Sequence, residues 1–132
     1  MSSRIRLKET VPQAPKGTYI AKCIHVEPNW TYLWNRKVAL YFEITEGVEK
    51  GKQARRFYRL QKYKDEYVIA PKSKFRKDLK KLFPEHAEQP DVDVKDLFFG
   101  VFFSIKVIEK RSRDGLTINA IVENIERIEV GF

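Results

Sequence analysis

Aromatic and cationic side chains lie close together in residues 29–37 of the chain. The segment is Asn-Trp-Thr-Tyr-Leu-Trp-Asn-Arg-Lys, in which three rings at alternate positions precede two cations. A flat ring can stack on another flat ring, and a cation can neutralise a neighbouring anion. Together they suit a ligand that combines planar groups with regularly spaced negative charge. The residues concerned are Trp30, Tyr32, Trp34, Arg36 and Lys37.

Positive charge is concentrated in the middle of the chain. Lys and Arg number 26 against 18 Asp and Glu, and 13 of the cations but only 3 of the acids lie in residues 50–82. Such clustering attracts polyanions, whether nucleic acid, an anionic membrane or an acidic protein. A solubilising surface is the plainer interpretation. The candidate cations are Arg55, Arg59, Lys62, Lys72 and Lys74, with Lys110, Arg111 and Arg113 further along the chain.

Residues for catalysis or metal binding are sparse. The chain has only two histidines, His25 and His86, and a single cysteine, Cys23. Neither a zinc cluster nor an intramolecular disulfide is therefore expected. Three aspartates in the acidic stretch 85–96 could hold a divalent metal for a nuclease, but prolines flank this stretch. No glycine-rich phosphate loop occurs. We expect no enzymatic activity, no metal and no cofactor.

The first strand is predicted to begin near Gly17. Residues 1–16 are expected to form an arm before one domain over residues 17–132, a common domain length. Residues 18–26 are rich in β-branched and aromatic side chains, and their hydrophobic phase switches after Cys23, which predicts a bulge. Pro28 and Asn29 are expected to end the strand, so residues 29–37 are predicted to form a loop. Packing beneath that loop is the alternative to ligand binding for its rings.

Two further strands are predicted in residues 38–44 and 52–60. Apolar residues alternate without a break in the second strand, which places Tyr41 on its outer side. In the third strand one phase buries Arg56 and the other buries Arg55 and Arg59. Two buried arginines cost more than one, whose long side chain can reach water. We therefore expect Phe57 to face outward, beside Tyr41.

A helix and two more strands are predicted in the second half of the chain. Apolar residues at positions i, i+4, i+7 and i+8 predict a helix over residues 71–83, with Pro71 in its first turn. Residues 85–96 are expected to be an extended surface linker. A strand over residues 98–109 and a return strand over residues 116–122 flank Asp114-Gly115, a strong hairpin signal.

The expected order of elements is β-β-β-α-β-β. A five-stranded barrel with one helix between strands three and four is the order of the OB fold, so we predict a mainly β, OB-like barrel. A split α+β sheet is the alternative, because spacing alone does not close a barrel.

Three phrases carry a family resemblance: PKGTYIAKCIHVE, KVALYFEITEGVEKGKQARRF and LFFGVFFSIKVIEKRSRDGLTINAIVENIERI. They resemble the small OB-fold single-stranded-DNA-binding proteins of phages and mobile elements. The shared features are a Gly-x-Tyr start, a turn like Gly47 to Gly51 and an Asn-x-Ile phrase at Asn119. The resemblance implies largely sequence-independent DNA binding in replication or recombination. The outer face of strands two and three, with the adjoining loops, would be the site.

Single-stranded nucleic acid is therefore the expected partner, and the resemblance favours DNA over RNA. No motif in the chain indicates a contact to a 2′-hydroxyl, so the residues themselves do not distinguish DNA from RNA. Without an apolar run of about 18–20 residues or a signal-peptide core, we expect a cytoplasmic protein with no membrane partner. A homo-oligomer and replication or recombination protein partners are left open. The alternative function is a basic interaction or regulatory module that binds an acidic protein.

Overall fold

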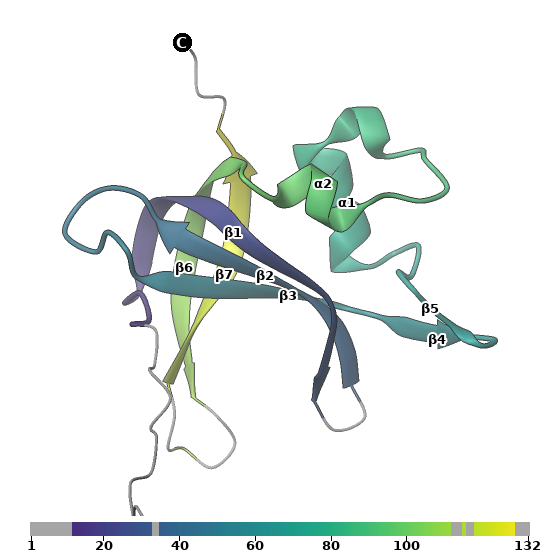
Figure 1. Cartoon of the computed structure of the whole chain (residues 1–132), viewed down its shortest axis with the longest axis horizontal. Coiled ribbons are helices and arrows are strands. Elements are labelled where there is room, and N and C mark those ends of the chain that lie inside the picture. The colour runs from purple at the N-terminus through teal and green to yellow at the C-terminus, as the bar shows by residue number, and fades with distance from the viewer. Residues whose placement is uncertain (1–11, 33–34, 112–114, 116–117, 129–132) are drawn as a thin grey trace, which may run out of the picture.

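The computed structural model describes residues 12–32, 35–111, 115 and 118–128, and the chain is mainly β (Figure 1). The first strands are β1 (Gly17–Tyr32), β2 (Asn35–Ile44), β3 (Gln53–Arg59), β4 (Gln61–Tyr63) and β5 (Glu66–Val68). There follow helix α1 (Lys74–Leu82), the short 3-10 helix η1 (Pro84–His86) and helix α2 (Val94–Phe98), and then β6 (Phe102–Arg111) and β7 (Ile118–Arg127).

The five long strands form one sheet that closes on itself. β2 pairs antiparallel with β1 and β3, and β6 pairs antiparallel with β1 and β7. The ring is completed by a parallel contact between β3 and β7, where Arg55 lies opposite Ile121. Both helices lie on one side of this ring (Figure 1). The predicted helix position between the third and fourth long strands is confirmed.

The chain segment before β1 reinforces the short parallel contact. Gln13 forms a parallel bridge with Gln53 at the start of β3, and the Gln13 Oε1 atom accepts a hydrogen bond from the Ala120 amide of β7 at 3.2 Å. Ala14 is buried. The end of the predicted arm therefore packs against both strands, while residues 1–11 lie outside the described part of the chain.

The core fills the interior of the ring and continues under α1. The alternating apolar residues of β2 are all buried, as predicted, and the apolar stripe of α1 is buried as well. Aromatic rings join the two layers, because Phe83 after α1 packs edge-on against Phe98 of α2 with ring centroids 5.1 Å apart. Phe98 in turn stacks on Phe103 of β6 at 5.7 Å.

The predicted bulge in β1 is confirmed, but the predicted end of this strand is wrong. The register with β2 shifts between Cys23 and His25, so that Cys23 and Val26 both face the core. β1 then continues through Pro28 to Tyr32. A second register shift between Glu27 and Trp30 accommodates the proline, because a bulge leaves a position without a ladder hydrogen bond. Most of the predicted 29–37 loop is therefore paired strand.

Other boundaries in the second half of the chain also differ from prediction. α1 begins at Lys74 and not at residue 71, because the Ser73 hydroxyl caps it by accepting from the Arg76 amide at 3.3 Å. The stretch 85–96 is not simply extended, since it contains η1 and the start of α2. Residues 98–101 precede β6, and the hairpin of β4 and β5 was not predicted.

The predicted phase of β3 is confirmed, yet Arg56 does not reach water. It is 3% exposed, and its Nη2 and Nε atoms donate to Asp78 Oδ2 of α1 at 2.7 and 2.9 Å. Its Nη1 donates to the Val122 carbonyl of β7 at 2.7 Å. The Tyr58 hydroxyl donates to the same carboxylate at 2.5 Å. Burial raises the pKa of Tyr58, so this donor stays protonated. One buried cluster thus joins β3, α1 and β7.

We predict that Asp78→Asn destabilises the fold by about 3–5 kcal/mol, because it leaves the Arg56 guanidinium buried without its counter-charge. Urea unfolding followed by circular dichroism measures this loss. Glu123→Gln is the matched control, since it removes the same charge from an exposed pair with Lys106 at 3.4 Å. It should cost less than about 1 kcal/mol. Equal losses in the two variants would contradict a special role for the buried pair.

Candidate functional site

Two aromatic rings meet on the outer face of the first three strands. Trp30 of β1 and Phe57 of β3 have ring centroids 5.0 Å apart at an interplanar angle of 52°. β2 runs between these strands, and its Ala39 lies opposite Phe57. Ala39 alternates with the inward residues of β2, yet it is fully buried. The rings of Trp30 and Phe57 therefore form one aromatic surface across Ala39, on the outer face of β1, β2 and β3.

Cations lie against these rings. The Lys37 Nζ atom is 5.5 Å from the Phe57 ring centre and 5.9 Å from that of Trp30. The Arg55 guanidinium is 5.5 Å from Phe57 and 6.0 Å from Tyr41. These distances fall within the range of cation–π attraction. Arg55 also donates to Asn119 Oδ1 at 3.2 Å, which extends the face to β7.

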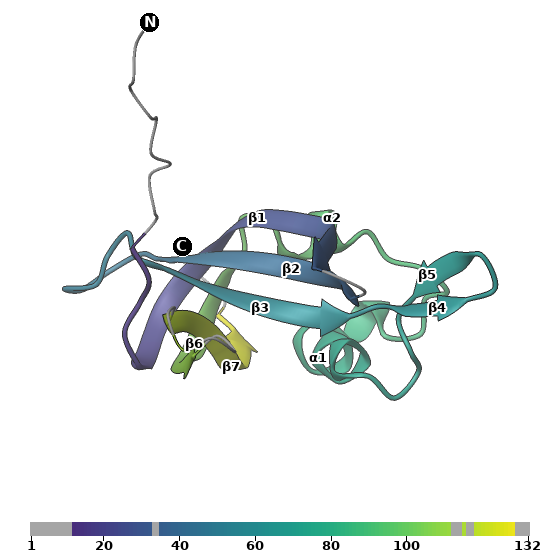
Figure 2. The same cartoon turned by 90° about the horizontal axis from the view of Figure 1, so that it is seen from below.

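A groove of about 890 Å³ opens beside Phe57, between the end of β3, the β4–β5 hairpin and the start of α1. Figure 2 shows that this hairpin projects beyond the closed sheet. None of the described residues that line the groove is acidic. We call it the basic groove; its cations are Arg36, Lys37, Arg59, Lys62 and Lys74, and its aromatic residues are Phe57 and Tyr67.

A cation–π pair joins the β4–β5 hairpin to the start of β2. The Arg36 guanidinium lies 4.3 Å from the centre of the Tyr67 ring. The hairpin turn contains Lys64 at φ 55°, the left-handed conformation that tight turns use. Tyr67 is not among the site residues that the sequence predicts. Its strand is three residues long, too short for a hydrophobic period to show.

Lys74 is exposed and lines the basic groove, in an unusual setting for a lysine. Its Nζ donates to the Phe57 carbonyl at 3.5 Å and lies 5.7 Å from the Tyr58 ring. Burial, and then the positive charge of Arg56, lower the pKa of Lys74 below its ordinary value. Asp78 raises the pKa of Lys74 in part, whereas Lys110 and Lys37 lower it further. A cation crowded by other cations is stabilised when an anion binds beside it.

The structure brings most of the predicted site residues together. The basic groove contains the predicted residues Arg36, Lys37, Phe57, Arg59, Lys62 and Lys74, and the adjoining face contains Trp30, Tyr41 and Arg55. Tyr41 and Phe57 share the outer side of the sheet, as predicted. The two strands pair in register there, with Tyr41 opposite Arg55 and Ala39 opposite Phe57.

The remaining predicted residues lie elsewhere or outside the described ranges. Lys110 and Arg111 are exposed at the end of β6 and do not line the basic groove, although Lys110 lies close enough to Lys74 to lower its pKa. Lys72 lines a separate hollow on the outer side of α1 and not the basic groove. Trp34 and Arg113 fall outside the described residues, and for Tyr32 only the backbone is described.

Two other classes of feature, metal-ligand clusters and membrane-spanning helices, are absent from the described ranges. Within them, no group of three His, Cys, Asp or Glu residues gathers as metal ligands would. No helix there is long and apolar enough to cross a membrane.

Comparisons with known proteins add no family. Neither the protein-family models nor the curated protein sequences contain a match to this chain. A functional proposal therefore depends on the geometry and charge of the basic groove.

We predict that Tyr67→Ala loosens the β4–β5 hairpin without lowering global stability. An exposed cation–π pair is worth about 0.5–1 kcal/mol, so local opening should increase about two- to fivefold. Hydrogen exchange of the β4 and β5 amides measures this opening. Tyr63→Ala is the control, because Tyr63 is 62% exposed and its ring contact is with the adjacent Lys64. Similar exchange in the two variants would show that the Arg36 contact does not hold the hairpin.

Proposed function

We propose that this protein binds single-stranded nucleic acid in the basic groove and on the adjoining face of β1, β2 and β3, and that it catalyses no reaction. The observation that carries this proposal is the composition of the groove: five cations and two aromatic residues, with no acidic residue among its described lining. Single strands offer an exposed base face to each ring and a phosphate to each cation.

The proposed fold family is the OB fold. Its support is the strand pairing, in which β1 pairs with both β2 and β6 and a parallel contact joins β3 to β7. In OB folds, the second and third strands and the loops after the first and fourth strands bind oligonucleotides. Here the β1–β2 and β6–β7 ends project on the same side of the ring (Figure 1). Both ends therefore flank the aromatic face.

Preference for a single strand follows from the aromatic surface. Bases in a duplex are already stacked on one another, so they cannot also stack on Trp30 or Phe57 without being unstacked. Stacking and phosphate contacts are available to every base, which supports largely sequence-independent binding. The proposal of DNA over RNA, and of a role in phage or mobile-element replication or recombination, is supported by the sequence resemblance alone.

The second candidate function is a module that binds an acidic protein. It is favoured by the presence of Trp30, Arg36 and Tyr67 on one surface, since Trp, Tyr and Arg are the residue types that most often anchor protein interfaces. The two functions differ in what the rings do, because only a nucleic acid offers bases for stacking.

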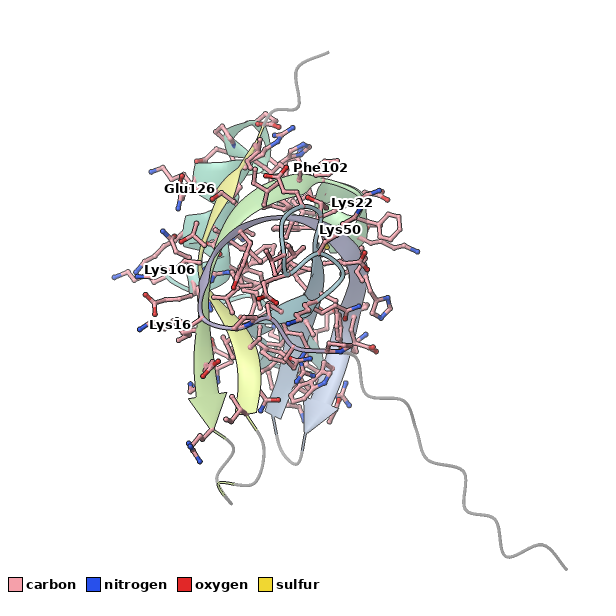
Figure 3. All side chains as sticks on the ribbon, turned by 90° about the vertical axis from the view of Figure 1, so that its left-hand side faces the viewer. Lys16, Lys22, Lys50, Phe102, Lys106 and Glu126 are labelled. Carbon is pink, nitrogen blue, oxygen red and sulfur yellow. The ribbon has the colours of Figure 1, made fainter. Side chains whose placement is uncertain are left out.

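We predict that Phe57→Ala lowers affinity for oligo(dT) by about 1–3 kcal/mol, the value of one stacked base, and leaves the salt dependence nearly unchanged. In a Trp34→Phe background, Trp30 emission should be quenched by oligo(dT) and much less by duplex. Phe102→Ala is the control, because Phe102 lies on the side of the molecule away from the groove (Figure 3). Emission that responds to neither ligand, with unchanged affinity, would favour the acidic-protein function.

We also predict that affinity falls steeply with salt, and that Arg59→Gln with Lys62→Gln reduces the log–log slope by about 1.4, or about 0.7 per lost phosphate contact on a single strand. Fluorescence titrations at several salt concentrations measure the slope. Lys16→Gln with Lys50→Gln removes the same charge far from the groove and should leave the slope nearly unchanged (Figure 3). A wild-type slope near zero would exclude phosphate contacts.

A further inference from the structure

A second basic hollow lies on the outer side of α1. Its volume is about 570 Å³, and its described lining contains four cations and one acidic residue, Glu88. None of the described residues that line it is aromatic. We call its cations, Lys72, Arg76, Lys77 and Lys80, the helix tract.

The helix tract is continuous with the basic groove. Ala70, Ser73 and Lys74 line the groove, whereas Pro71 and Lys72 line the hollow, so the two meet where α1 begins. Residues three apart are neighbours on a helix surface, with Cβ atoms about 5–6 Å apart. Lys74, Lys77 and Lys80 therefore form a row of positive charge that leads from the groove to the hollow.

Among the described residues that line the hollow, Glu88 alone could offset the charges of the helix tract. α1 has one acidic residue, Asp78, and its carboxylate is directed inward to Arg56. Among the described residues, no ion pair involves a cation of the tract. By contrast, Lys106 of β6 pairs with Glu123 of β7 at 3.4 Å.

An unneutralised row of like charges disfavours a helix unless an anion binds to it. A polyanion already seated in the basic groove is the ligand closest to this row. The absence of rings in the hollow means that bases would find no stacking partner there. Contacts in the helix tract would be to phosphates alone.

We propose that a single strand leaving the basic groove crosses the start of α1 and lays its phosphates along the helix tract. This inference rests on the proposed function and extends it. The groove binds bases and phosphates of a short segment, and the helix tract adds phosphate contacts only when the strand is long enough. One protein molecule then covers more nucleotides than the sheet face alone would cover. The added affinity depends strongly on salt and not on base identity.

The test compares two lengths of oligo(dT), about 4 and about 16 nucleotides, which span the site sizes of single OB-type domains. The variant is Arg76→Gln with Lys77→Gln and Lys80→Gln, in the full chain. Glutamine forms helices well, so α1 is retained, and circular dichroism verifies this. The control is Lys16→Gln with Lys22→Gln and Lys50→Gln, which removes the same charge from exposed residues on the other side (Figure 3).

The helix variant should bind the long strand on the order of tenfold more weakly at low salt, with a log–log salt slope smaller by about 2, and should bind the short strand within about twofold of wild type. The control variant should bind both strands as wild type does.

Equal losses of affinity for both lengths, or equal losses in the helix variant and the control, would mean general attraction and overturn the inference. Unchanged binding of the long strand would overturn the inference too, and would favour an acidic protein as the ligand of the hollow. If wild type binds neither strand, the proposed function itself fails.

Discussion

The buried ion pair of Arg56 and Asp78 is the interaction on which the candidate site depends. It joins residues 22 positions apart and fixes α1 against β3 with bonds of 2.7 and 2.9 Å. Side chains alternate along a strand, so an inward Arg56 requires Arg55 and Phe57 to face outward. Asp78 also lies one turn after Lys74 on α1, so the same pair sets where Lys74 meets the end of β3. The positions of Phe57 and Lys74 in the lining of the basic groove both follow from this contact.

The same pair explains the distribution of charge. A buried guanidinium needs a counter-charge, and the acidic residue that supplies it is the only one in α1. With Asp78 directed inward, the outer surface of the helix presents lysines and arginine without compensation. The basic groove and the helix tract are therefore two sides of one helix whose single carboxylate serves the interior. The inward position of Asp78 thus stabilises the fold and also leaves the outer surface of α1 positive.

In the basic groove, aromatic rings hold the cations in place, as acidic residues do elsewhere on the protein. Lys37 and Arg55 lie at ring faces, and Arg36 stacks on Tyr67 at 4.3 Å. A ring holds a cation in place without cancelling its charge, whereas a carboxylate would cancel it. Ordered cations that keep their charge are suited to phosphates, and the rings themselves are suited to bases. The outer face of the sheet and the β4–β5 hairpin thus hold the cations in fixed positions and leave them charged.

The sequence by itself determined the inward set of β2, the phase of β3 and the apolar stripe of α1. In each case the burial of several side chains at once outweighs any local alternative. It did not determine that β1 continues past Pro28, because pairing with β2 is a tertiary contribution that a bulge makes compatible with proline. Nor could it identify Asp78 as the partner of Arg56, or join Arg36, Phe57, Tyr67 and Lys74 into one groove. Those residues belong to different elements, and no periodicity within a segment reports a contact between segments. Only closure of the sheet and docking of the helix bring them together.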